Sequence, residues 1–257
     1  MEILDEITKD YVTDLMKKNK RSDDRGYFDY RPCTVEKGIF ESAEGSARVK
    51  LGRTQVVAGV KVTMGTPFKD RPEEGVLSTT AELLPLASPT FEPGPPDESA
   101  IELARIVDRG IRSSNAIDLE ALFIEKDKVL MVFVDIYVLD HDGNLIDASA
   151  LAAMAALLNA KVPKIEEGKL ITSERTNPLK VTQKVVTCTF SKIDSQIVLD
   201  PGLDEEKAMS ARLTLATTPE YVCAMQKGGK GAFTSDELIN LIDVSFEKGN
   251  ELRRLLG

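Results

Sequence analysis

The sequence predicts an α+β fold of two layers, made of two similar units that each place helices against a sheet. Three patterns carry this prediction. Strands are predicted between residues 30 and 66, where apolar and polar residues alternate, and again between residues 181 and 225. A helix follows the strands in each half. A six-residue segment at 46–51 also returns in altered form at 210–215, as a duplicated unit would produce.

Composition limits the class of protein. The chain has 257 residues, 42% of them apolar, which is enough to bury a large core as one domain or two. Its longest apolar run, residues 148–158, is far shorter than the roughly 20 residues that span a bilayer. The N-terminus is charged from Glu2 onward. We therefore predict no membrane segment and no secretory signal.

Cysteine and histidine usage argues against a metal site. The three cysteines are widely spaced and have no close cysteine or histidine partner in the sequence, which predicts neither disulfides nor bound zinc. The single histidine, His141, lies between two aspartates and is expected in an exposed turn. We predict no metal, no cofactor, and a reduced, cytoplasmic location.

The net charge of −9 restricts how the chain meets nucleic acid. Affinity for nucleic acid comes largely from neutralising phosphates, so a protein that binds over its whole surface is normally basic. Any RNA contact by this chain is therefore expected to be local, with a modest salt dependence for each copy.

The chain divides into three parts. Residues 1–25 are predicted to form an amphipathic helix up to Lys17 and then an exposed, charged connection. Residues 26–165 are predicted to form a first domain, and residues 180–257 a second. The polar segment 161–169 is interpreted as the crossing between them.

A rigid loop and a helix stand out in the first domain. Five of the twelve prolines lie in residues 85–96, which excludes an ordinary helix or central strand there. Asp97 or Ser99 then caps a helix that is expected to reach about Ser114.

The strand predicted at 129–139 ends at the turn Asp142-Gly143-Asn144, and a helix at 149–158 that is apolar on every side follows it. Such a helix belongs in the interior of the protein.

The helix after the proline-rich loop carries the candidate binding residues. At about 100° per residue, Arg105, Arg109 and Arg112 fall within a stripe of about 60°, opposite the apolar residues. Arginine suits phosphate because its planar guanidinium donates two parallel hydrogen bonds. The alternative is a solvated helix face, since Glu102 precedes Arg105 by three residues and Asp108 precedes Arg112 by four.

The residues around this helix carry a resemblance to a known family. The run 85–98, followed by Glu102-Leu103-Ala104-Arg105 and Asp108-Arg109, resembles the RNase PH-like ring subunits of archaeal and eukaryotic exosomes. More narrowly, it is similar to the non-catalytic subunit of the archaeal ring. The segment 45–58, with Gly45-Ser46-Ala47-Arg48-Val49, is similar to the strand pair that opens this fold. The resemblance extends from about residue 20 to the end.

The resemblance implies an RNase PH-like fold with two β-α units of ribosomal-protein-like βαβ topology. It implies a hexameric ring of three heterodimers with a catalytic RNase PH-like paralogue, capped by RNA-binding subunits. Single-stranded RNA would pass through the ring and be shortened from its 3′ end by phosphate attack. Arg105 and Arg109 match the positions at which the family contacts the RNA backbone, and Arg112 is added from its place on the same stripe.

Two departures from the active members of the family predict that this copy has no catalytic residues. The family's phosphate-binding arginine is absent, because residues 144–147 read Asn-Leu-Ile-Asp, and Asp147 adds a negative charge where an anion would dock. The essential aspartate position of the second unit is filled by Arg212, which cannot hold a divalent cation or deliver a proton. The acids at 204–206 are interpreted as an exposed turn rather than a metal cluster.

Two alternatives stay open. The chain is an active phosphorolytic exoribonuclease if an unrecognised acid such as Asp140 or Asp204 serves the reaction. It is a stand-alone RNA-binding module if no ring forms.

Overall fold

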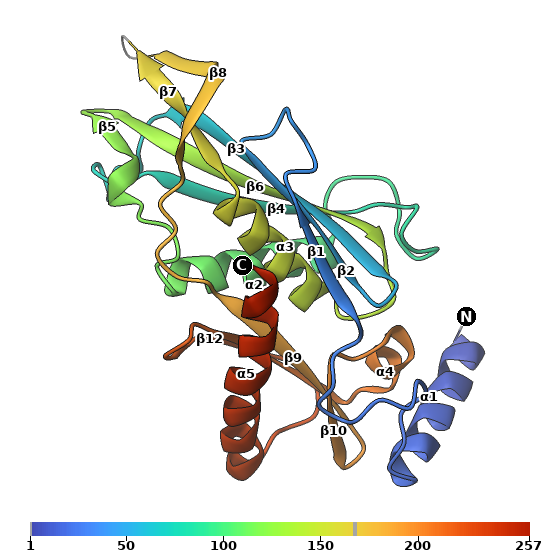
Figure 1. Ribbon diagram of the computed structural model, residues 1–257. Coiled ribbons are helices and arrows are strands. Elements are labelled where there is room, and N and C mark those ends of the chain that lie inside the picture. The colour runs from blue at the N-terminus through green and yellow to red at the C-terminus, as the bar shows by residue number, and fades with distance from the viewer. Residues whose placement is uncertain (1, 167–168) are drawn as a thin grey trace.

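The computed structural model describes residues 2–166 and 169–257, and it has two main sheets with helix α3 between them (Figure 1). α3 (Leu145–Leu158) contacts strands β2 and β3 of the first sheet and strand β9 of the second. Each sheet thus has helices packed against it, which confirms the predicted α+β class.

The first sheet has the strand order β1-β2-β3-β6-β4, and β5 also pairs with β6. Its pairs are antiparallel except that of β4 and β6, which run parallel and are joined through helix α2 (Glu98–Ser113). Parallel neighbours need such a crossover connection. The strands are β1 (Cys33–Lys37), β2 (Gly45–Leu51), β3 (Thr54–Gly65), β4 (Val76–Leu83), β5 (Phe123–Glu125) and β6 (Lys128–Asp140). A short 3-10 turn, η1 (Glu120–Leu122), precedes β5.

Helix α3 forms the centre of the core. Its residues 146–157 are buried on every side because sheets cover it from two directions, and this confirms the interior helix. The helix begins at Leu145, four residues before the predicted start. Asn144 adopts the left-handed conformation, with φ of +52°, and its side chain accepts a hydrogen bond from the backbone N–H of Asp147. The turn after β6 therefore leads directly into the cap of α3.

The second sheet is antiparallel, with the strand order β10-β9-β11-β12, and helix α5 (Ser235–Leu255) packs on β9 and β11. Its strands are β9 (Val186–Ile193), β10 (Gln196–Leu199), β11 (Ala211–Thr217) and β12 (Val222–Gly229). Thr234 caps α5 and exchanges hydrogen bonds with Glu237.

The N-terminal segment is attached to the second sheet, and two predictions fail here. Residues 204–206 belong to helix α4 (Leu203–Ala208) and do not form an exposed turn. Helix α1 (Glu2–Lys17) packs against α4. The connection after α1 is not wholly exposed, because Arg21 is only 1% exposed and Glu205 of α4 only 2%. The Arg21 guanidinium donates two hydrogen bonds to the Glu205 carboxylate, at 2.8 and 2.7 Å. A buried charge needs such a partner, and this pairing attaches the connection to α4.

The segment interpreted as a crossing is a hairpin instead. Strand β7 (Lys161–Glu166) pairs in antiparallel register with β8 (Lys169–Pro178). Two residues of the predicted crossing, Glu167 and Gly168, lie outside the described residues. The chain reaches the second sheet only after β8.

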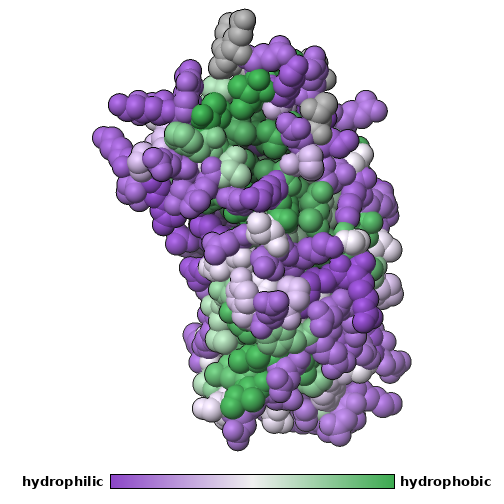
Figure 2. All heavy atoms as spheres, turned by 60° about the vertical axis from the view of Figure 1, so that its left-hand side comes forward, coloured by the Kyte–Doolittle hydropathy of each residue, from purple (hydrophilic) through white to green (hydrophobic). Residues whose placement is uncertain are grey.

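The surface shown in Figure 2 is mixed in character. Apolar side chains gather in two areas, one toward the end of the molecule that carries β7 and β8 and one toward the opposite end, with a largely hydrophilic band between them. Of the helices in the described parts of the chain, none has both the length and the apolar character needed to cross a membrane.

Candidate nucleic-acid interface

Helix α2 presents the predicted arginines because its other face is buried. Asp97 caps the helix, with its Oδ1 accepting a hydrogen bond from the Ala100 N–H at 2.8 Å. The buried face packs on β4 and α3. It consists of Ala100, Leu103, Ala104, Ile106, Val107, Gly110 and Ile111. The polar residues between these positions are left to face outward.

The structure brings Arg105 and Arg109 together. Both are exposed and line one surface cavity of about 290 Å³, which strand β12 closes on one side through Gln226. The Arg109 Nη1 donates a hydrogen bond to the Gln226 Oε1 at 2.9 Å. Arg105 makes no hydrogen bond or ion pair with any residue that the structure describes. The cavity therefore offers one unengaged guanidinium and one that is oriented by a neutral amide.

Arg112 is separated from the other two arginines. Its Nε donates to the Asp108 Oδ2 at 2.8 Å, and its Nη2 donates to the Leu77 carbonyl oxygen at 2.7 Å. It lines a different cavity, of about 460 Å³, together with Arg71 and Asp118. The helix-surface pair considered for Asp108 and Arg112 is thus present.

The Arg212 side chain, on β11, lines a small pocket together with residues of α2, the start of α3 and α4. Its Nη2 lies 2.6 Å from the Glu102 Oε1 of α2. The pocket has a volume of about 180 Å³ and is also lined by Glu206, Phe91 and His141. A cation therefore occupies the place that the resemblance assigns to the acid of active relatives, and its charge is engaged by a carboxylate.

One acid of this pocket, Glu206, differs from the expectation of an exposed carboxylate. Burial raises the pKa of Glu206 to about 7, against the opposing backbone hydrogen bond from Asn144 and the charge of Arg212. The Asn144 N–H donates to the Glu206 Oε1 at 2.8 Å. Asp204 is exposed on α4, and Asp140 is half-buried at the end of β6. Neither Asp140 nor Asp204 lines the pocket of Arg212.

His141 is not the exposed turn residue that the sequence predicted. It is half-buried, and its ring stacks on Phe91 of the proline-rich loop with 5.3 Å between centroids and 14° between planes. Burial lowers the pKa of His141, against the charges of its neighbouring aspartates. The stacking attaches the proline-rich loop to the end of β6.

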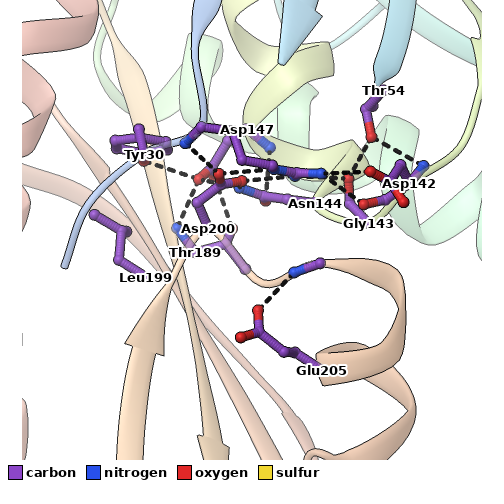
Figure 3. A network of polar contacts seen from close by, with 12 residues as sticks. Tyr30, Thr54, Asp142, Gly143, Asn144, Asp147, Thr189, Leu199, Asp200 and Glu205 are labelled. Atoms are coloured by element: carbon purple, nitrogen blue, oxygen red, sulfur yellow. Dashed lines mark hydrogen bonds and ion pairs between the residues drawn. The ribbon is translucent and has the colours of Figure 1, made fainter. Parts of the chain in front are cut away.

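Asp147 also differs from its predicted role as a charge placed where an anion would dock. It is buried and accepts hydrogen bonds from Tyr30, Asn144, Thr187 and Thr189, several of which are drawn in Figure 3. Burial raises the pKa of Asp147 to about 6, although the hydrogen bonds from Asn144 and the threonines lower it. The side chain attaches the start of α3 to strand β9 and offers no surface to a ligand.

A second buried carboxylate, Asp200, joins the same network (Figure 3). The Arg31 guanidinium donates to both of its oxygens, at 2.9 and 2.8 Å, and the Asn144 Nδ2 donates to its Oδ1 at 2.8 Å. Burial acts to raise the pKa of Asp200, but the hydrogen bonds and charge of Arg31 outweigh it and hold the pKa below its usual value. The arginine beside the start of α3 is thus paired with the protein's own acid.

Sequence reasoning did not identify Gln226, Glu206 or the partner of Glu102. The strand register contained part of the signal, because Arg212 lies opposite Gly228 and Thr214 opposite Gln226 across β11 and β12. Residues opposite one another point to the same side of a sheet. Which helix covers that side was not readable from the sequence. Among the residues that the structure describes, no three His, Cys, Asp or Glu side chains gather to form a metal site.

The comparisons with known proteins agree with this architecture. Residues 29–163 match the model of domain 1 of the 3′ exoribonuclease family, RNase PH, and residues 184–248 match the model of domain 2. The chain is 51% identical to the exosome complex component Rrp42 of Pyrococcus furiosus, over 99% of this chain and 94% of that protein. It is 49% identical to the protein of the same name from Methanothermobacter thermautotrophicus, over 98% and 95% of the two chains.

Solved structures show the same similarity. A chain of the Archaeoglobus fulgidus exosome with RNA bound to the active site superimposes with a TM-score of 0.93 at 46% identity, covering 99% of this chain and 100% of that one. Rice Rrp46 shares the fold alone, with a TM-score of 0.71 at 17% identity over 92% and 98% of the chains. This chain therefore belongs to the 3′ exoribonuclease family of RNase PH.

Proposed function

We propose that this chain is the non-catalytic ring subunit of an archaeal exosome, which helps to bind RNA while a catalytic RNase PH-like paralogue shortens it from the 3′ end by phosphorolysis. In this proposal three heterodimers of the two chains form a hexameric ring in the cytoplasm, and RNA-binding cap subunits cover one end. Residues 26–165 and 180–257 are its two domains. The similarity to archaeal Rrp42 proteins and to exosome cores supports it.

One observation carries the proposal: an arginine-lined cavity lies beside a pocket in which Arg212 stands at the position where active relatives are expected to have an acid. Arg105 and Arg109 offer guanidinium groups to a phosphate backbone. Backbone contacts of this kind fix the position of a strand without reading its bases. Arg112 is a weaker contributor in this proposal, because it is already paired with Asp108.

The absence of activity in this copy follows from charge. Phosphorolysis needs a cradle for inorganic phosphate and a carboxylate that binds a metal or delivers a proton. Arg212 stands where the acid is expected, and a guanidinium group has only donors, so it cannot hold a metal ion as a carboxylate would. Beside the start of α3, Arg31 is already paired with the buried carboxylate of Asp200, so it offers no free guanidinium to inorganic phosphate. Glu206 is the acid nearest to a reactive role, so it is the residue to remove in testing for residual activity.

Reconstitution tests the proposal. The purified chain alone, the paralogue alone and their mixture are supplied with a labelled single-stranded RNA and inorganic phosphate, and nucleoside diphosphates are measured. We expect no release from this chain alone and full release only from the mixture. Diphosphate release by this chain alone that is abolished in Glu206→Gln would identify an active enzyme. A monomeric mass in light scattering with the paralogue present would favour a stand-alone RNA-binding module.

The arginines are tested in the assembled ring. Arg105→Glu with Arg109→Glu reverses two charges at the cavity, so RNA affinity should fall. The salt dependence of binding should become shallower by about 0.7 for each phosphate that the ring no longer neutralises. Lys18→Glu with Arg254→Glu makes the same charge change at exposed positions that line neither arginine cavity and serves as the control. Both rings should assemble, as judged by size-exclusion chromatography. Equal RNA affinity in the two rings would refute the assignment.

A further inference from the structure

We propose that Arg212 is a positioning residue for RNA binding, which pairs with Glu102 and so keeps that carboxylate from neutralising Arg105. The inference rests on the proposed function, because it takes Arg105 to contact the RNA backbone. It gives the cation at position 212 a task beyond the loss of an acid.

The geometry of the pair supports this role. The Arg212 side chain is 16% exposed, whereas that of Glu102 is 45% exposed, so the arginine is the fixed member of the pair. Strand β12 leaves room for it: a Cβ atom built at Gly228, directly opposite Arg212, would lie 3.3 Å from the Arg212 Nη2. The Arg212 guanidinium thus lies over Gly228 and extends to α2, where its Nη2 donates a hydrogen bond to the Glu102 Oε1 at 2.6 Å.

The sequence of α2 alone favours a different pairing. Glu102 and Arg105 are three residues apart, a spacing at which opposite charges on a helix attract one another. In the structure Glu102 turns to Arg212, and Arg105 has no partner among the residues described. The second acid and base on the helix do pair with each other, because Asp108 forms an ion pair with Arg112 four residues later. The difference between the two pairs is the cation that β11 supplies.

This redirection matters because the three groups share one cavity. Glu102, Arg105 and Arg109 all line the cavity of about 290 Å³. A free carboxylate there would repel phosphate and compete with it for Arg105. With Glu102 engaged from the second sheet, Glu98 is the one carboxylate among the described residues lining the cavity that has no cation partner, and it faces two arginines. The charge of Arg109 is also preserved, because its partner Gln226 is a neutral amide that orients the guanidinium without cancelling its charge.

The test uses the ring assembled with the catalytic paralogue, in phosphate-free buffer so that the RNA stays intact. Affinity for a fluorescent oligoadenylate is measured by anisotropy at several salt concentrations for Arg212→Gln, Arg212→Lys, Glu102→Gln with Arg212→Gln, and Arg105→Gln. Arg212→Gln should weaken binding about twofold, the factor expected when an i,i+3 ion pair competes for Arg105. Arg212→Lys should retain affinity. The double variant should recover it, because the released carboxylate is gone.

The outcomes separate this inference from the proposed function. If Arg212→Gln leaves the affinity unchanged while Arg105→Gln lowers it, the positioning role is wrong and the RNA contact stands. If the double variant binds as weakly as Arg212→Gln, the ion pair acts only on structure, and the inference is again wrong. If Arg105→Gln itself has no effect, the proposed RNA contact fails, and the role of Arg212 fails with it. Size-exclusion chromatography confirms that each ring is intact.

Discussion

The buried ion pair between Arg21 and Glu205 gives the strongest prediction about stability. Besides its two bonds to the Glu205 carboxylate, Arg21 donates to the backbone oxygens of Gly26, Leu199 and Asp200. Arg21→Ala leaves a carboxylate and several carbonyl groups buried without these donors. Removing one member of a buried pair costs about 3–5 kcal/mol. At about 2–4 °C per kcal/mol for a chain of this size, Tm should fall by about 6–20 °C.

Urea unfolding followed by circular dichroism measures the effect on the free energy of unfolding. Arg21→Lys keeps the charge but removes the planar guanidinium, so its stability should lie between those of wild type and Arg21→Ala. Arg21→Met combined with Glu205→Leu replaces both charges with apolar groups of similar size and should recover part of the stability, because no carboxylate is left unpaired although the backbone carbonyls still lack their donors. A decrease below about 1 kcal/mol for Arg21→Ala, typical of a surface pair, would refute the reasoning.

Two further predictions concern the contact between the first and second sheets. The first concerns Glu206, whose pKa is about 7 in the folded state, against an ordinary value of 4.5. Between these two values the folded state keeps a proton that the unfolded state releases. The stability that the protonated Glu206 contributes is therefore lost as pH rises through this range. The free energy of unfolding is measured at both ends of that range for the wild type and for Glu206→Gln, and it should decline less with rising pH in the variant. An equal decline in the two proteins would contradict this. Gly143→Ala should cost about 2–5 kcal/mol, because φ is +89° and the added Cβ would lie 2.5 Å from the Pro201 carbonyl oxygen. Gly59→Ala, where the Cβ meets open space, is the control in the same unfolding assay, and an equal destabilisation in both would count against steric crowding.

Local patterns predicted the elements whose signal is contained in a few neighbouring residues. The start of α2 after Asp97 and the interior character of α3 both follow from patterns within one segment. Strand β4 (Val76–Leu83) was missed, since Ser78, Thr79 and Thr80 interrupt its apolar pattern. Its parallel pairing with β6 is a long-range contact that no local pattern in its own residues signals.

Long-range pairing was the part that the sequence did not reveal. Arg21 and Glu205 are separated by 184 positions, and each looks like an ordinary surface charge in its own segment. Asp147 was assigned to an open anion site, because the two threonines of β9 that bury it lie far from it in the sequence. The arginine stripe on α2 was visible from periodicity, but the division between Arg105 with Arg109 and the paired Arg112 depends on β12 and β4.

The route of the chain between α1 and β1 has a consequence for anyone who divides this protein into fragments. Arg25 and Arg31 both reach Asp200, while Arg21 reaches Glu205, so three cations from one short stretch neutralise acids that belong to the far half of the sequence. A fragment that starts where the family's first domain model starts, at residue 29, lacks two of them. Expressed alone, the C-terminal half would carry bare carboxylates in its interior. Complementation by a synthetic peptide spanning the missing stretch is then a natural way to restore its folding.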